Sequence, residues 1–406
     1  MSHKVSIPIG PYHPLQEEPE FYQLIVEGEQ VVDIDVRIGW NHRGIEKLAE
    51  AKSFDQVIFL VERICGICST SHPLASVQAI EDIDGIKVPE RALYIRTIVA
   101  ELERLHSHLL WVGLAGHFLG YNTVFMWGWK YREPILDIFE AITGNRNHYG
   151  MMKVGGVRRD IDEADIPWII KQLDTLLPAI EMFRGAVLDD PVLHARLKGV
   201  GVLTRQDAID YSALGPTARA SGLAIDVRRD EPYAAYDRVK WNVVTQESGD
   251  VFAKTMVRIL EMAESVEIVK QCLERLPKGE IDAKVKDISP GEGIGRHEAP
   301  RGEVFHYVRS DGSNSPSRYK VRAPTYMNFP TFKTTVIGET IADATIILAA
   351  IDPCYCCTER MTVVDNKTKK MVFTPYDLIK LSQEKTHRLL HRFGINDHPH
   401  TMTGTA

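Results

Sequence analysis

Two pairs of cysteines are the residues of this chain with the clearest capacity for chemistry. Cys65 and Cys68 stand two residues apart in "RICGIC", and Cys354 and Cys357 repeat that spacing in "DPCYCC". Four thiolates in two such pairs suit a tetrahedral sulfur site for zinc, iron–sulfur or nickel. The long stretch of chain between the pairs weakens the interpretation as a zinc ribbon, whose pairs lie about 15–20 residues apart. A zinc site remains an alternative at this point.

Composition narrows the class of protein. The chain has 406 residues, 44% hydrophobic and 25% charged, which are ordinary values for a globular protein. Its net charge of −7 argues against a nucleic-acid partner, because phosphate binding needs a basic face. The N-terminal residues do not resemble a signal peptide, so we expect reduced thiols and attribute the clustered cysteines to metal or redox chemistry.

Residues 109–129 carry no formal charge over about the length that a membrane span requires. The segment also contains His117, Asn122 and four glycines, and an amphipathic helical pattern leads into it. We therefore predict a buried core segment. Membrane association would then come through partner subunits.

Periodicity predicts an α+β fold that is mainly α. Apolar residues alternate over residues 30–38, which predicts a strand paired in a hairpin with the preceding stretch "FYQLIVEGEQ", with Gly28 in the turn. Helical spacing follows Pro89 and recurs over residues 168–183 and 251–273. Glycine-rich segments and short strands follow from residue 291 to about residue 330. We expect long central helices with an N-terminal β-hairpin and a small C-terminal β-structure.

Around its cysteines the chain resembles the large subunit of nickel–iron hydrogenases. The two cysteine pairs of that family read R-x-C-G-x-C and D-P-C-x-x-C, and both occur here, as residues 63–68 and 352–357. The Ala-Pro-Arg-Gly motif of the family occurs as residues 299–302, and its later Pro-Thr segment as Pro324 and Thr325. The resemblance covers essentially the whole chain and implies the hydrogenase large-subunit fold.

The resemblance is strongest to the energy-converting membrane-complex branch, which includes Ech-type and formate hydrogenlyase enzymes. The stretches "GPYHPLQEEPE", "HRGIEKLAE", "ELERLHSHLL" and "GPTARASG" are also similar to the quinone-pocket 49 kDa subunit of complex I. That relative lacks the cysteine pairs, whereas all four cysteines are present here. Hydrogen chemistry is therefore favoured over a complex I-like NADH/quinone oxidoreductase subunit, and a zinc-stabilised scaffold is the third interpretation.

The resemblance implies a specific cofactor. Nickel would be held by four thiolates, two of which also bridge to an iron that carries one carbon monoxide and two cyanide ligands. By motif, Cys65 and Cys354 would be terminal on nickel, and Cys68 and Cys357 would bridge. The implied reaction is the reversible reduction of protons to dihydrogen.

Arg301 and four other residues of the motifs would surround this cofactor. The resemblance places Pro300 and Arg301 beside it, where the guanidinium can hydrogen-bond a cyanide and polarise dihydrogen. Asp352 would anchor Arg301, although a local backbone cap is its ordinary alternative. Pro324 and Thr325 would face the other cyanide, although a turn hydroxyl explains Thr325 equally well.

His72, Glu18 and Glu46 complete the predicted site. His72, four residues beyond Cys68, can donate to a bridging sulfur, unless it is a satisfied core histidine. Glu18 is the predicted proton exit, with Glu17 and Glu20 as competitors that would otherwise lie on the surface. Glu46 occupies a place where many relatives bind magnesium. Its usual histidine partner is replaced here by Arg360, which puts that metal in doubt.

The remaining cysteines and glycines receive no cofactor role. We assign Cys272 to the core, since it falls on an apolar helical face, and expect Cys356 to point away from the ligands. The "GEGIGR" run at residues 291–296 lacks the Lys-Ser/Thr pair of a phosphate loop.

No cysteines are left for an iron–sulfur cluster, so electrons must pass through another polypeptide. The family pairs this subunit with a small hydrogenase subunit that carries a 4Fe–4S cluster. In this branch, ferredoxin or a formate or carbon monoxide dehydrogenase module supplies electrons, and antiporter-like membrane subunits move ions. The expected location is the cytoplasmic side of the membrane.

Residues after the second pair resemble an extension that a maturation endopeptidase removes in the formate hydrogenlyase branch. The matching cut lies between Arg360 and Met361, which predicts a mature domain of residues 1–360 and an extension of residues 361–406. The alternative is that residues 374–393 form a permanent amphipathic helix that docks on a partner.

Overall fold

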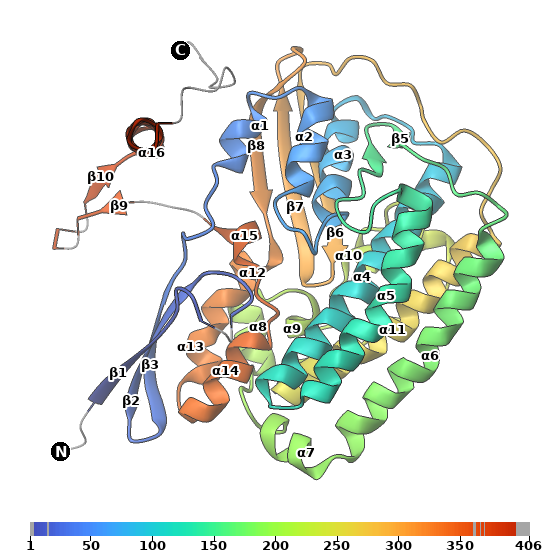
Figure 1. Ribbon diagram of the computed structural model, residues 1–406. Helices are drawn as coiled ribbons and strands as arrows, with labels where there is room; N and C mark the ends of the chain where they lie inside the picture. Colours follow the sequence, from blue (N-terminus) through green and yellow to red (C-terminus); the bar gives the residue numbers. More distant parts are fainter. Residues whose placement is uncertain (1–3, 14–15, 360–362, 366, 369, 395–406) are drawn as a thin grey trace. The chain divides into compact units, whose positions relative to one another are not determined.

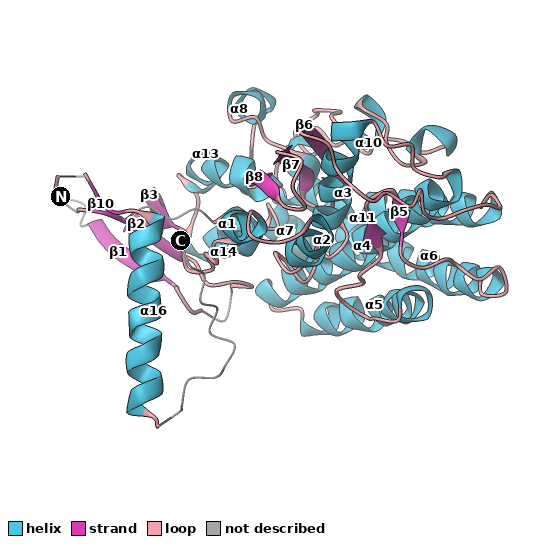
Figure 2. Cartoon of the chain, turned by 90° about the horizontal axis from the view of Figure 1, so that it is seen from above, coloured by secondary structure: helices cyan, strands magenta, loops and turns pink. Residues whose placement is uncertain are grey.

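The computed structural model describes residues 4–13, 16–359, 363–365, 367–368 and 370–394. The chain divides into two compact units, Met1–Thr358 and Glu359–Ala406. Helices dominate the chain, as predicted, and the strands form small antiparallel sheets (Figure 2).

Four long helices form the centre of the first unit (Figure 1). They are α4 (Glu90–Phe118), α5 (Asn122–Thr143), α6 (Ile166–Asp189) and α11 (Val251–Glu274). Helix α4 packs against both α5 and α11, and α6 packs against the same two helices. The three helices predicted after Pro89 and around residues 168–183 and 251–273 are therefore confirmed, with α4 buried along most of its length.

A three-stranded antiparallel sheet packs against helix α3 (Ser71–Asp84). Its strands are β6 (Gly291–Ala299), β7 (Gly302–Ser310) and β8 (Pro316–Arg322), in that order. A Cβ atom at Gly293 would lie 2.0 Å from the Ala79 carbonyl oxygen, and one at Gly295 would lie 1.9 Å from that of Ala75. The glycine run is thus a strand whose bare backbone lets α3 approach.

The N-terminal sheet has three strands, β1 (Lys4–Ile9), β2 (Phe21–Glu27) and β3 (Gln30–Arg37). The predicted hairpin is confirmed, and Gly28 sits in its turn with a φ of 63°. Strand β1 was not predicted, because Pro8 interrupts its pattern; the proline is tolerated on an edge strand. The sheet packs on α13 (Phe332–Val336) and α14 (Ile341–Ala349).

The predicted buried segment at residues 109–129 is only half correct. Residues 109–118 end α4, and α5 begins at Asn122 after a turn in which Gly120 has a φ of 86°. The α4 part is mostly buried, whereas the first turns of α5 expose Met126 (63%) and Trp127 (37%). Within the described part of the chain, no helix has the length and apolarity to cross a membrane.

Shorter elements connect these parts. In the first unit they are α1 (Ile45–Ala49), α2 (Phe54–Glu62), β4 (Met152–Lys153), β5 (Gly156–Val157), α7 (Pro191–Leu197), α8 (Arg205–Asp210), α9 (Gly215–Arg219), α10 (Val227–Asp230), η1 (Tyr236–Arg238), α12 (Pro324–Asn328), η2 (Phe329–Thr331) and α15 (Tyr355–Thr358). The second unit contains β9 (Val363–Val364), β10 (Met371–Phe373) and α16 (Pro375–Arg392). The predicted cut between Arg360 and Met361 lies outside the described residues and stays a prediction.

Candidate metal centre

Cys65 and Cys68 lie on the loop that joins α2 to α3. Helix α2 starts at a Ser53 capping box and ends at Glu62, so the chain turns away just before Cys65. The Cys68 backbone N–H points back at the Cys65 sulfur, 3.4 Å away. Both thiols are buried, each with 3% of its surface exposed.

Cys354 and Cys357 lie on either side of the start of α15. The chain reaches them through Asp352, which adopts the left-handed conformation with a φ of 57°. The Cys354 backbone N–H donates to the Thr325 hydroxyl at 3.0 Å, which ties this turn to α12. Thr325 is therefore more than a local turn hydroxyl, because it holds a cysteine segment distant in sequence.

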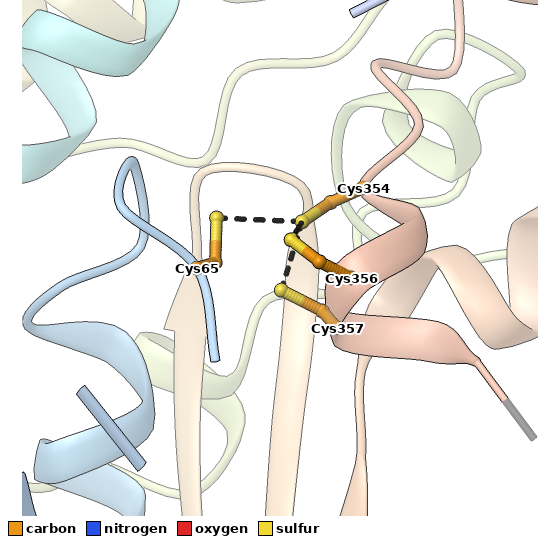
Figure 3. A group of neighbouring side chains, drawn as sticks. All are labelled: Cys65, Cys354, Cys356 and Cys357. Carbon is orange, nitrogen blue, oxygen red and sulfur yellow. Dashed lines mark hydrogen bonds between the residues drawn. The ribbon is translucent and has the colours of Figure 1, made fainter. Parts of the chain in front are cut away.

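The fold brings the two cysteine segments together (Figure 3). The Cys354 sulfur lies 3.4 Å from that of Cys65 and 2.8 Å from that of Cys357. Hydrogen bonds from the other thiols, that of Cys354 first, lower the pKa of Cys65 well below its ordinary value. A thiolate is thus favoured at this position before any metal binds.

Cys356 corrects one expectation. Its side chain does not point away from the ligands, because its sulfur lies 3.6 Å from that of Cys354. Among the described residues, the ligand atoms of Cys65, Cys354, Cys356 and Cys357 all lie within 4.8 Å of one another. The physical reason is Glu18, whose carboxylate accepts hydrogen bonds from both the backbone N–H and the thiol of Cys356.

Cys68 lies at the edge of this group, toward Arg301. The Arg301 Nη1 atom is 3.7 Å from the Cys68 sulfur. Cys68 is not part of the set of four sulfurs within 4.8 Å of one another that the described residues form. The thiol of Cys68 nevertheless interacts with those of Cys354, Cys357 and Cys65, so the four predicted cysteines converge, with Cys68 also beside the arginine.

Arg301 occupies the tip of the β6–β7 hairpin, where Pro300 and Arg301 form the two-residue turn. Only 3% of its surface is exposed, so the alternative of an ordinary surface arginine is wrong. Its Nε donates to the Asp352 carbonyl oxygen at 2.8 Å, and its Nη2 lies 2.5 Å from the Asp352 carboxylate. The expected contact between Asp352 and Arg301 is therefore present.

Two contacts that the sequence did not reveal hold Arg301 and its turn from α4. Nη1 of Arg301 donates to the Ser107 hydroxyl at 3.1 Å, and the Arg104 Nη1 donates to the Ala299 carbonyl oxygen at 3.3 Å. Ser107 and Arg104 lie one helical turn apart on α4, so a single helix face supports both. The sequence feature that could have indicated both residues is the "ELERLHSHLL" stretch, which contains them and is similar to the complex I subunit.

His72 stands at the start of α3 and contacts a predicted bridging cysteine, Cys357, with 3.3 Å between Nε2 and sulfur. Its Nδ1 lies 3.1 Å from His306 Nε2, and Nδ1 of His306 lies 2.8 Å from the Tyr319 hydroxyl. Burial lowers the pKa of His72 to about 4, so its ring is neutral at neutral pH. A neutral ring has one N–H, which can face either the sulfur or His306.

Glu18 lies 3.8 Å from the Cys354 sulfur through its Oε1 atom. Burial, and next the negative charge of Cys65, raise the pKa of Glu18. Burial and the nearby Asp352 raise the pKa of Glu17 to about 8, and Glu17 and Glu20 line a small cavity of about 30 Å³. The alternative that both competitors lie on the surface is therefore wrong.

Glu46 makes contacts that differ from a metal site. Its Oε2 lies 2.7 Å from the Lys320 Nζ, and its Oε1 accepts from the Val321 backbone N–H at 3.0 Å. Both carboxylate oxygens thus have protein partners, one of them cationic. Arg360 lies outside the described residues, so the predicted replacement of the magnesium partner stays a prediction.

Arg43 is a further residue that the sequence analysis missed. Its guanidinium donates to the carbonyl oxygens of Arg63 (2.8 Å), Ile64 (2.6 Å) and Cys356 (3.2 Å). One side chain therefore ties the Cys65 loop to α15. The sequence feature that could have indicated Arg43 is the family-like stretch "HRGIEKLAE", in which we assigned a role only to Glu46.

Two family models match the chain. The description "Respiratory-chain NADH dehydrogenase, 49 Kd subunit" matches residues 119–292 and 283–360, and "Nickel-dependent hydrogenase" matches residues 43–114. The hydrogenase match contains the first cysteine pair. The two models together therefore cover the chain from the first pair to the second.

The decisive relative is the alpha subunit of a membrane-bound hydrogenase from Pyrococcus furiosus. The two sequences are 44% identical over 95% of this chain and 94% of that protein. The chain belongs to the family of hydrogenase large subunits and complex I 49-kDa subunits. Its membrane-bound, energy-converting hydrogenase members are the branch that we expected from the motifs.

Other members of the family are named for activities other than hydrogen chemistry. An NADH-quinone oxidoreductase chain of Dehalococcoides mccartyi is 40% identical over 85% of this chain and 95% of that protein. A solved structure of a membrane-bound sulfane sulfur reductase, described as an archaeal respiratory membrane complex, contains a chain that superposes with a TM-score of 0.84 and 30% identity. The superposition covers 88% of this chain and 98% of the matched chain. Family membership thus fixes the fold, and the residues of the site must decide the chemistry.

Proposed function

We propose that this chain is the catalytic large subunit of a membrane-associated nickel–iron hydrogenase that reduces protons reversibly to dihydrogen. The observation that carries the proposal is the convergence of two distant cysteine pairs beside the buried guanidinium of Arg301. A purely structural zinc site needs four thiolates but no buried arginine or carboxyl group beside them. The combination therefore favours a catalytic centre.

The residues present fit the cofactor that the family resemblance implies. Thiolates are soft ligands suited to nickel and iron, and the site is buried, which limits access of water. Cys65, Cys68, Cys354 and Cys357 would hold this centre through their sulfur atoms. When bound, the nickel–iron centre, with carbon monoxide and cyanide on the iron, supplies the heterolytic cleavage of dihydrogen.

The chain's own residues would orient the cysteine ligands and polarise dihydrogen. Arg301 keeps a positive charge at the sulfur cluster because Asp352 and Ser107 hold its guanidinium in place. The Thr325 hydroxyl accepts a hydrogen bond from the Cys354 backbone N–H and so fixes that turn. The His72 ring contacts the Cys357 sulfur. Hydrogen–deuterium exchange between dihydrogen and heavy water by the purified complex tests this proposal, because exchange requires cleavage of dihydrogen.

Glu18 moves the proton in this proposal. We expect Glu18→Gln to retain nickel and iron but to lower hydrogen–deuterium exchange by about 100-fold, within the range for a lost general acid–base. Glutamine keeps the size and an oxygen that accepts from the Cys356 N–H, but it cannot take up a proton. Glu17→Gln is the matched control, since Glu17 is also half-buried and has a raised pKa but makes no described hydrogen bond to a cysteine. An exchange rate like that of the wild type in Glu18→Gln would remove Glu18 from the proton path.

Partners follow from the proposed chemistry. Relatives are parts of membrane-bound complexes, so we propose a small subunit with a 4Fe–4S cluster that relays electrons to and from the metal centre. Ferredoxin or a dehydrogenase module would deliver electrons, antiporter-like subunits would couple the reaction to ion movement, and the complex would face the cytoplasm. The apolar first turns of α5, with Met126 and Trp127 exposed, are consistent with a chain that docks on others.

A complex I-like quinone reaction is the second candidate, favoured by the 40% identity to a quinone oxidoreductase chain. The two functions give opposite results in one assay. A hydrogenase exchanges dihydrogen with heavy water without quinone, whereas a quinone oxidoreductase supports quinone-dependent turnover and shows no such exchange. The four cysteines favour the first outcome.

Processing of the C-terminus is a further prediction. We propose that a maturation endopeptidase cuts between Arg360 and Met361 after metal insertion, because Cys354 and Cys357 must be accessible while the metals are loaded. Intact-mass measurement of the nickel-loaded protein should show loss of residues 361–406. An active, metal-replete protein at full-length mass would refute cleavage and favour α16 as a permanent docking helix.

A further inference from the structure

Cys356 is a fifth thiol at the metal centre, and none of the motif-derived roles accounts for it. Its sulfur is one of the four that lie within 4.8 Å of one another in the described chain, the others being those of Cys65, Cys354 and Cys357. Those three cysteines are buried, whereas Cys356 is partly exposed. Cys356 is therefore the member of the close set that solvent reaches most readily.

Three hydrogen bonds fix the Cys356 side chain in this position. Its backbone N–H and its thiol both donate to the Glu18 carboxylate, at 2.9 Å and 2.5 Å, and its carbonyl oxygen accepts from Arg43 at 3.2 Å. The backbone is thus held on both sides, and the thiol is held toward Cys354 (Figure 3). Without these contacts, a cysteine at this place in a short helix could point to solvent.

We propose that Cys356 is an entry ligand, which captures a divalent metal ion together with Cys65, Cys354 and Cys357 and then yields its place to Cys68. The inference rests on the proposed function and adds to it a step of metal loading. The geometry favours this order, because Cys356 belongs to the close set and is partly exposed, whereas Cys68 is buried beside Arg301. Four thiolates around a divalent ion form a stable tetrahedral set.

The exchange balances without any oxidant or reductant. On capture, the S–H bonds of the protonated thiols break and four sulfur–metal bonds form; the Cys356 proton passes to the Glu18 carboxylate that already accepts it, and the protons of the other thiols pass to solvent. On transfer, the Cys68 thiol loses its proton and binds the metal, and Cys356 leaves the metal and takes a proton back. The metal keeps its oxidation state throughout.

Cobalt(II) titration of the metal-free, full-length protein under anaerobic conditions tests the proposal through the thiolate-to-cobalt charge-transfer band. In Cys356→Ser the band should lose about a quarter of its intensity per bound cobalt, since one of four thiolates is gone. In Cys68→Ser the band should keep its wild-type intensity. Cys272→Ser is the matched control, because that cysteine lies in the apolar core.

Other outcomes distinguish a failure of the entry role of Cys356 from a failure of the proposed hydrogenase function. If Cys68→Ser loses a quarter of the band and Cys356→Ser loses none, the motif set binds first and the entry role of Cys356 is overturned. If the wild-type protein shows no thiolate band, the metal centre itself fails, and the proposed function fails with it. Circular dichroism of each variant shows whether a lost band reflects misfolding, and Cys356→Ala provides a second replacement if the serine variant does not fold.

Discussion

Replacing Cys68 by serine should abolish the nickel–iron centre and the hydrogen activity that depends on it. A serine hydroxyl is a harder ligand than a thiolate and stays protonated, so it cannot bridge two metals in this place. We expect nickel per protein chain to fall below about a tenth of the wild-type value, given the dependence of such sites on thiolate ligands. Elemental analysis of the purified complex measures this directly. The proposed entry set does not contain Cys68. The variant should therefore still bind a divalent ion at the entry set, although it should not assemble the nickel–iron centre.

Cys272→Ser is the control for that experiment. Cys272 is fully buried on α11 among apolar side chains, away from the thiol cluster. The variant should keep its nickel and its activity, at a cost of about 1–3 kcal/mol in stability for burying a hydroxyl. Equal loss of nickel in the two variants would show that our division of the cysteines is wrong.

The second large effect concerns Arg301. Arg301→Lys should retain nickel and iron but lower hydrogen turnover by about 100- to 1,000-fold, the usual effect of removing one preorganised charged donor. A lysine has one ammonium group on a flexible stem, so it cannot contact Asp352, Ser107 and the cluster at the same time, as the guanidinium fork does.

Arg296→Lys is the matched control, on the strand that leads to the turn of Arg301. Arg296 lies on β6, is partly exposed and pairs with Glu231 on the surface, so its replacement should leave turnover close to that of the wild type. Turnover in Arg301→Lys at the wild-type level would contradict a polarising role. Loss of nickel in that variant would assign Arg301 to assembly of the centre.

Much of the fold was predictable because its signals are local. Alternation over residues 30–38 indicated the N-terminal hairpin, and helical spacing indicated α4, α6 and α11. Strand β1 was missed because Pro8 hides a pattern that only pairing with β2 rescues. The break between α4 and α5 was missed because composition alone does not show where a glycine turns the chain.

The site was predictable where a motif carried it. The cysteine pairs could be named from their spacing and Arg301 from the family motif, and the contact of Arg301 with Asp352 agrees with their assigned pairing. Contacts between segments far apart could not be read in this way. Ser107 and Arg43 entered the site through packing of α4 and of the loop before α1, and the direction of Cys356 depends on Glu18, more than three hundred residues earlier in the chain.

Metal analysis combined with infrared spectroscopy of the purified complex tests the central claim most directly. The account predicts nickel and iron in equal amounts in this chain, together with infrared bands of carbon monoxide and cyanide bound to iron. These bands come from ligands that no protein side chain supplies, so they distinguish the proposed centre from any thiolate site for a single metal. Zinc alone, or no metal together with quinone-dependent activity, would contradict the assignment of this chain as a hydrogenase catalytic subunit.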